Sequence, residues 1–153
     1  MRVCGIDPGN NGAICVLDST DPTYIVLLDL AKTTIYEATK SLHHQNIDIV
    51  YLESVHSIFG MSAKSNFGFG RSVGQVIAIA EIVTRGTPPE LVTPKKWQKF
   101  VGVTTKGKFI KKEVAAIATK LYPSAVITGA RGGLLDGRSD SICIAYFGMC
   151  HKD

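Results

Sequence analysis

The chain has 153 residues, of which 45% are hydrophobic and 20% are charged, and its formal net charge is +4. This length predicts a single domain over residues 1–153, with a buried core. No apolar run approaches the roughly 20 residues that a membrane span requires, and no charged-then-apolar signal peptide leads the chain. We therefore expect a cytoplasmic protein without membrane association.

The first third of the sequence predicts a small antiparallel meander. Three short runs rich in Val, Ile and Leu, at residues 2–7, 13–18 and 24–30, are joined by turn-forming residues. Residues 34–45 have a helical pattern, and the compact apolar run 48–53 predicts a fourth strand. A helix between two strands implies a crossover, which would make this strand parallel to an earlier one.

The remaining elements complete an α/β pattern. Residues 54–70 are rich in Gly and Ser and lack clean periodicity, which predicts a long functional or mobile loop. Residues 71–85 are apolar or small on almost every side, which predicts a buried helix or a subunit contact. A short strand at 90–94, two helical stretches within 95–121 and a final helix over about 135–150 follow. The expected fold is a mixed five-stranded sheet flanked by helices.

The cysteines do not have the spacing of a metal site. Cys4, Cys15, Cys143 and Cys150 all lie in apolar segments, without a C-x-x-C pair or a nearby histidine. We expect them to be buried and reduced, and we do not expect zinc.

Positive charge is concentrated in one region. Residues 95–120 contain eight lysines and a single acid, Glu113. A merely solubilising surface usually mixes charges of both signs, so a block of one sign favours a polyanionic partner such as nucleic acid. These lysines are Lys95, Lys96, Lys99, Lys106, Lys108, Lys111, Lys112 and Lys120.

Four acids have positions that suggest a common site. Asp7 and Glu53 end two predicted strands, and the carboxyl ends of parallel strands meet at one edge of a sheet. Asp136 and Asp140 lie four residues apart, on one face of the last predicted helix. Each acid also has an ordinary structural explanation, in a turn, at a strand end or near a helix N-terminus. Their joint placement favours a site.

Grouped carboxylates raise one another's pKa, and a divalent cation offsets that repulsion. Ligand sets made only of oxygen select Mg²⁺ or Mn²⁺ over zinc. Two such ions can activate a water and stabilise the leaving oxygen of a phosphodiester. Together with the basic region, the acids predict a nuclease with two ions in each active site.

Five segments, in their order along the chain, resemble the RuvC-like Holliday junction resolvases, particularly the short phage-type members. The segments are "GIDPGNNGAICVLD", "IVYLESV", "FGFGRSVGQV", "VTPKKWQKFVG" and "LDGRSDSICIAYFG", and they cover nearly the whole chain. The resemblance implies an RNase H-like fold and a homodimer that nicks symmetric strands of four-way DNA junctions with divalent metal. For a phage-encoded member it implies the host cytoplasm.

The resemblance also assigns roles to the acids. Asp7 would ligate or bridge the metals, Glu53 would be the second ligand, and Asp140 matches the last acid of the family's final helix. The cellular pattern spaces its final two acids by three residues, but Gly137 stands at that place here. Asp136, in the "DGR" variant typical of phage relatives, therefore receives the fourth role.

DNA contacts are expected from aromatic and basic residues. The family often has an aromatic residue three positions after its second acid, which stacks at the crossover. Here His56 holds that position and Phe59 follows, and the sequence leaves open which of them stacks. Lysines near the family's active site assist catalysis; we assign this role to Lys112, although spacing alone leaves Lys99 and Lys111 open. The predicted DNA-binding set is His56, Phe59, Lys96, Lys99, Lys106, Lys108, Lys111 and Lys112.

Three alternative functions compete with junction resolution. The enzyme could prefer Y-shaped or flapped DNA, since shape and phosphates rather than bases would be recognised. It could be a non-catalytic DNA-binding module, against which the intact Asp7, Glu53 and Asp140 argue. The first segment alone also resembles actin-like kinases, whose two-domain cleft cannot be completed by 153 residues.

Overall fold

The computed structural model describes residues 1–55 and 60–151 and contains one mixed five-stranded sheet in the order β3-β2-β1-β4-β5. The strands are β1 (Arg2–Asp7), β2 (Ala13–Asp18), β3 (Ile25–Asp29), β4 (Ile49–Glu53) and β5 (Glu90–Val92). The first three pair antiparallel, whereas β4 runs parallel to β1 and β5 runs parallel to β4. The predicted fold class and the predicted crossover before the fourth strand are confirmed.

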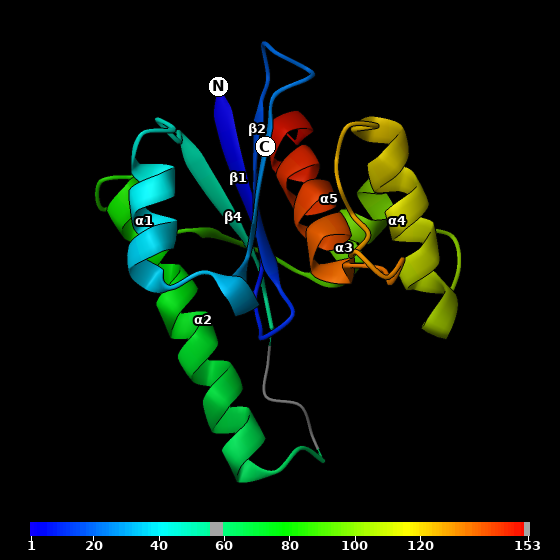
Figure 1. The fold of residues 1–153 in the computed structure, drawn as a ribbon, viewed down its shortest axis with the longest axis horizontal. Coiled ribbons are helices and arrows are strands. Elements are labelled where there is room, and N and C mark those ends of the chain that lie inside the picture. Colours follow the sequence, from blue (N-terminus) through cyan, green and yellow to red (C-terminus); the bar gives the residue numbers. More distant parts are fainter. Residues whose placement is uncertain (56–59, 152–153) are drawn as a thin grey trace.

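Helices cover both faces of the sheet (Figure 1). On one face lie α1 (Ile35–His43) and α2 (Ala63–Val83). On the other face α5 (Asp136–Cys150) packs directly against β1 and β2, with α3 (Pro94–Val101) and α4 (Ile110–Leu121) beside it. Two short 3₁₀ turns, at Leu30–Lys32 and Gly107–Phe109, complete the secondary structure. In the part of the chain that the structure describes, no helix is both long and apolar enough to cross a membrane.

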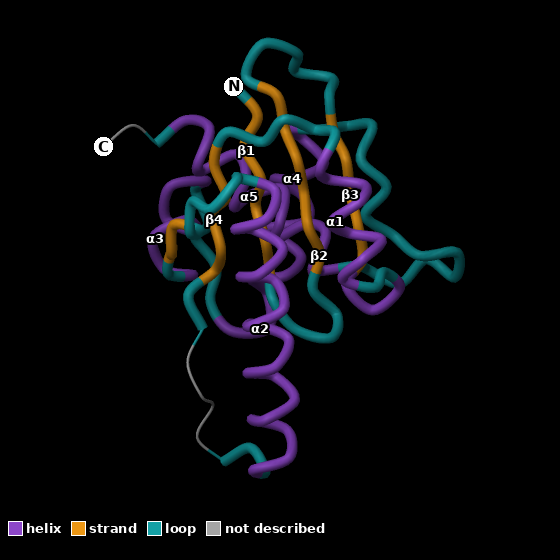
Figure 2. The backbone as a smooth tube through the Cα atoms, turned by 90° about the vertical axis from the view of Figure 1, so that its left-hand side faces the viewer, coloured by secondary structure: helices purple, strands orange, loops and turns teal. Residues whose placement is uncertain are grey.

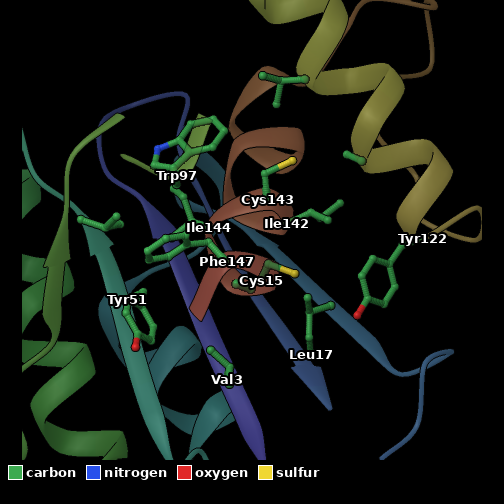
Figure 3. Packing of buried hydrophobic residues seen from close by; sticks show 14 of the residues in the cluster. Val3, Cys15, Leu17, Tyr51, Trp97, Tyr122, Ile142, Cys143, Ile144 and Phe147 are labelled. Atoms are coloured by element: carbon green, nitrogen blue, oxygen red, sulfur yellow. The ribbon is translucent and has the colours of Figure 1, made fainter. Parts of the chain in front are cut away.

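Two hydrophobic clusters fill the layers on either side of the sheet. Figure 3 shows the cluster between the sheet and α5, which includes Val3, Leu17, Trp97, Ile142 and Phe147. Helix α5 is buried around most of its circumference because it lies between the sheet and α4. Helix α5 carries two of the predicted site acids. It is therefore held by packing contacts on several sides, rather than along one apolar stripe only.

The cysteines follow the prediction in three of four cases. Cys4, Cys15 and Cys143 are buried and free, and they pack as small apolar side chains in the two clusters. Cys150 is exposed, so the expectation of burial was wrong at this position. It is the last residue of α5, where the helix reaches the surface.

Helix α2 begins eight residues earlier than predicted, at Ala63. The hydroxyl of Ser62 accepts a hydrogen bond from the Ser65 amide and caps the helix, so much of the predicted loop is helical. The stretch predicted as a buried helix or subunit contact, residues 71–85, is buried on one side only, where Val76, Ile79, Ala80 and Val83 join the core. The first half of α2 projects beyond the sheet (Figure 2), and Phe67 there is 77% exposed.

Candidate active site

Asp7 and Glu53 lie side by side at one end of the sheet. Strands β1 and β4 run parallel with Ile6 opposite Leu52, so the next residue of each strand emerges at the same edge. This edge, at the lower end of the sheet in Figure 1, is where α/β folds place their sites. The predicted pairing of these two acids is present.

Two glycines let α5 approach this edge closely. A Cβ added to Gly5 of β1 would lie 2.3 Å from the Ala145 amide nitrogen, and one added to Gly137 would lie 2.2 Å from the Asn11 carbonyl oxygen. Neither position therefore tolerates a side chain without movement of the backbone. Position 137 faces the turn that follows β1, so an acid would not fit there, whereas the predicted fourth acid stands at position 136.

An arginine fixes the first turn of α5 to the sheet. The Arg138 guanidinium donates two hydrogen bonds to Asp29 at the end of β3, from Nε to Oδ1 at 2.6 Å and from Nη2 to Oδ2 at 2.8 Å. Its Nη1 donates a third to the Val126 carbonyl oxygen at 2.7 Å. Such a bidentate pair constrains orientation as well as distance. Asp136 and Asp140 are therefore held in place by a residue that the sequence did not single out.

The carboxylates interact strongly with one another. Burial raises the pKa of Asp7 to about 8, and the charges of Asp140, Glu53 and Asp136 contribute to the rise. Burial likewise raises the pKa of Asp140 to about 7, together with the charges of Glu53 and Asp136. These shifts show that the four acids, which come from two strands and one helix, share one electrostatic environment. Strongly perturbed acids of this kind are typical of functional sites.

Trp97 is the immediate partner of Glu53. Its side chain is completely buried, and the indole Nε1–H donates a hydrogen bond of 2.8 Å to Oε1 of Glu53. Burial raises the pKa of Glu53, and this hydrogen bond opposes the rise. Trp97 lies beside α5 in the cluster of Figure 3, and nothing in the sequence distinguishes it from an ordinary core residue.

Among the described residues, Lys111 is the lysine that forms an ion pair with one of the four acids. Its ammonium group forms an ion pair with Asp136, and the pKa of Lys111 is raised by this contact and by the charges of Asp140 and Asp7. Lys112, to which the sequence assigned the catalytic role, is the next residue of α4 and makes no ion pair with a site acid among the described residues. Lys99 is exposed on α3.

The donor set has the chemistry of a site for a hard divalent cation. It consists of carboxylate oxygens only, two of the acids are largely buried, and their mutual repulsion is offset by a single ammonium group. Within residues 1–55 and 60–151, however, no three acidic, histidine or cysteine side chains surround one point closely enough to share an ion as they stand. Asp136 is engaged by Lys111 and Glu53 by Trp97.

The predicted DNA-binding residues are spread over several places. Lys106 and Lys108 lie in the turn that leads into α4, at the end of that helix from which Lys111 contacts Asp136. Lys96 lies elsewhere, with its ammonium 5.5 Å from the centre of the Phe147 ring, which belongs to the second half of α5. His56 and Phe59 fall outside the described residues.

A groove lies beside the turn that follows Asp7. It has a volume of about 480 Å³ and runs between the turn after Asp7 and the projecting half of α2. Its lining residues are Gly9, Asn10, Asn11, Met61, Lys64, Ser65, Gly68 and Phe69. The site edge is thus bordered by the projecting half of α2 on one side and by the start of α4 on the other.

The fold matches solved Holliday junction resolvases over nearly the whole chain. The structure of RuvC from T. thermophilus in complex with a Holliday junction substrate superposes with a TM-score of 0.62 at 16% identity, covering 95% of this chain and 90% of that one. The fowlpox virus resolvase in complex with its junction DNA superposes with a TM-score of 0.55 at 17% identity, covering 97% of each chain.

No protein-family model matches the chain, and a search of curated protein sequences finds no significant match. The structural likeness therefore shows the fold: the chain shares its fold with these solved resolvases.

Proposed function

We propose that this protein is a metal-dependent endonuclease that resolves four-way DNA junctions. The observation that carries the proposal is the meeting of Asp7, Glu53, Asp136 and Asp140 at the carboxyl edge of the sheet. They meet in a fold that matches Holliday junction resolvases. The substrate class rests on that likeness, because the solved neighbours include complexes with junction DNA.

The four acids would hold Mg²⁺ or Mn²⁺, with two ions in each site. When bound, such ions supply an activated water and stabilise the charge on the leaving oxygen. The protein's own part is to hold the four acids on rigid elements: Asp7 and Glu53 end paired strands, and α5 is fixed by Arg138. Asp7 is central, since the charges of all three other acids act on it.

Lys111 is the residue we propose for stabilising negative charge at the reacting phosphate. It is the one lysine among the described residues that is ion-paired to a site acid, and a divalent ion would compete with it for Asp136. Once released, its ammonium group would remain beside the scissile phosphate. Lys106 and Lys108, just before the same helix, would bind backbone phosphates next to the cut.

We propose that the protein acts as a homodimer, because two symmetric strands of a junction require two sites. Helix α2 is the candidate for part of the contact, since Ile82 in its second half is 51% exposed although its neighbours Ala80 and Val83 are buried. Sedimentation of the purified protein at micromolar concentration should give twice the monomer mass of 16.5 kDa. A monomer at that concentration would contradict the dimer.

Cleavage of labelled synthetic DNA tests the function directly. Wild-type protein and Asp7→Asn are compared on a four-way junction, a Y-shaped DNA and a linear duplex of the same sequence, with Mg²⁺, Mn²⁺ or chelator. Paired symmetric nicks on the junction, lost with chelator and in Asp7→Asn, are the expected result. The variant should still bind the junction, because only a negative charge near phosphates is removed.

The other outcomes distinguish the alternatives. Equal cutting of the Y-shaped DNA would make the protein a broader branched-DNA nuclease. Tight junction binding without any cutting would make it a binding module and would contradict the catalytic proposal.

A further inference from the structure

The position of Trp97 follows from the short backbone connection between β5 and α3. Val92 at the end of β5 pairs with Glu53 at the end of β4, and the Ser54 amide donates a 2.7 Å hydrogen bond to the Val92 carbonyl oxygen. A single residue, Thr93, separates β5 from α3. Its hydroxyl caps the helix by accepting from the Lys96 amide, and Pro94 is the first helical residue.

The connection from β5 to α3 is too short for α3 to lie far from Glu53. The strand that pairs with Glu53 leads within two residues into the helix that carries Trp97, so the first turn of α3 brings the indole to the Glu53 carboxylate. The indole nitrogen is only a donor and is completely buried, so it needs an acceptor. It finds that acceptor in Oε1 of Glu53, at 2.8 Å.

The hydrogen bond leaves the two oxygens of Glu53 unequal. Oε1 is engaged by the indole, whereas Oε2 has no hydrogen bond or ion pair with any of the described residues. We infer that Trp97 is a positioning residue, which fixes the orientation of the Glu53 carboxylate so that Oε2 is presented to a divalent cation. The inference rests on the proposed metal-dependent function and assigns one of its supporting residues.

Trp97 is also the sole tryptophan of the chain, which makes its role measurable without any substrate. Its fluorescence and the NMR signal of its indole N–H report on one hydrogen bond to one candidate ligand. Titration of the DNA-free protein with Mg²⁺ should shift both signals saturably. In Glu53→Gln the amide oxygen can still accept the indole hydrogen bond, but the ligand charge is lost, and the Mg²⁺-dependent shift should disappear.

Removal of the donor tests the positioning role. Trp97→Phe keeps an aromatic ring but lacks the N–H group, and it should weaken Mg²⁺ binding, measured calorimetrically, about 10- to 100-fold. For cleavage, the Mg²⁺ concentration at half-maximal rate should rise by a similar factor, while kcat at saturating Mg²⁺ is largely retained. Phe147→Leu, a change in the same core cluster, serves as the control and should lower stability without changing Mg²⁺ affinity.

If Trp97→Phe does not fold, as judged by circular dichroism, a benzothienyl analogue of tryptophan at position 97 replaces it. The analogue keeps the ring shape and substitutes sulfur for the N–H group, and it should give the same loss of Mg²⁺ affinity. Wild-type affinity for Mg²⁺ in the folded variant would overturn the inference. So would Trp97 signals that do not respond to Mg²⁺ in a wild-type protein that cuts junctions.

The failure of the proposed function would be seen separately. If the wild type cuts no branched DNA, the Mg²⁺ titration alone decides the role of Trp97. Weaker binding in the variant than in the wild type would support the inference, and a wild type that binds no Mg²⁺ would overturn it.

Discussion

Burial and three neighbouring carboxylates all oppose the ionisation of Asp7. With a pKa raised to about 8, Asp7 holds a proton at neutral pH in the metal-free folded protein, whereas in the unfolded chain it titrates near its ordinary value of 3.8. The raised pKa of Asp140 acts in the same sense. Between pH values near the ordinary pKa of 3.8 and the raised pKa of about 8, the folded state therefore binds more protons than the unfolded state.

This difference predicts how stability depends on pH. The free energy of unfolding of the metal-free protein should fall as the pH rises from about 5 to about 8, because the unfolded chain releases protons that the folded chain retains. Asp7→Asn should show a shallower fall, and saturating Mg²⁺ should stabilise the wild type most at the upper end of the range. Urea denaturation at several pH values measures this, and a flat profile for the wild type would contradict it.

Lys111 and Lys112 form a natural pair for comparison, since they are adjacent but only Lys111 reaches the acids. Lys111→Met should lower the cleavage rate about 100-fold at saturating DNA, the usual cost of losing one group that stabilises transition-state charge. Lys112→Met is the matched control and should retain most of the rate. Single-turnover cleavage of the junction measures both, and equal rates would assign the catalytic lysine elsewhere.

Among single residues, the sequence predicted the four acids of the candidate site but not which side chains contact them. An acid at the end of each of two parallel strands is a visible pattern, and so are two acids on one helix face. The choice between Lys111 and Lys112 depends on how α4 is rotated against α5, since adjacent helical residues point about 100° apart. Trp97 carried no signal, because a lone tryptophan in a helical segment is usually a core residue.

Among the elements, α5 depends on Arg138 for the position of its first turn. Arg138→Met removes three hydrogen bonds and leaves Asp29, whose side chain is 14% exposed, with the exposed Lys32 as its remaining ion-pair partner. We expect a loss of about 2 kcal/mol in the free energy of unfolding, in the range for hydrogen bonds to charged groups. Cleavage should also fall, since Asp136 and Asp140 lie on the same turns.

Chemical denaturation and cleavage assays measure the two effects of Arg138→Met. Arg131→Met, at an exposed position in the loop before α5, is the control and should change neither. Unchanged stability in Arg138→Met would show that packing alone positions α5.

The start of α2 is where the sequence pattern predicted a loop and the structure has a helix. The meander and the parallel fourth strand followed from chain order and from the rules for crossovers, but Gly68 and Gly70 made a helical stretch resemble a loop. Each glycine disfavours a helix by about 1 kcal/mol relative to alanine. The cap at Ser62 and continuity with the buried half of α2 outweigh that cost, and neither is evident from composition.

Across the whole molecule, the lysines that cluster in the sequence at residues 95–120 lie in several separate places. Lys106 and Lys108 lie at the end of α4 next to the acids, whereas Lys120 lies in its last turn. Lys106→Glu with Lys108→Glu should weaken junction binding and reduce the salt slope, by about 0.9 for each phosphate that the protein no longer neutralises. Lys120→Glu is the control at the far end of the same helix and should have a smaller effect.

Fluorescence anisotropy of labelled junction at several salt concentrations measures these slopes. Equally weakened binding in the two variants would indicate that general charge, rather than a defined DNA path, governs the affinity.

The close approach of backbone atoms at Gly5 and Gly137 has an evolutionary consequence. At these two positions the main chain of α5 packs directly on its neighbours, and together with Arg138 they locate the helix without using the acids it carries. The scaffold therefore does not depend on the charge of Asp7 or Asp140 for its shape, and neutralising these two acids relieves repulsion. A descendant of this protein could lose these acids in a few mutations and keep its fold and its lysines. If the proposed function is correct, such lineages would be expected to survive as junction-binding proteins that no longer cut.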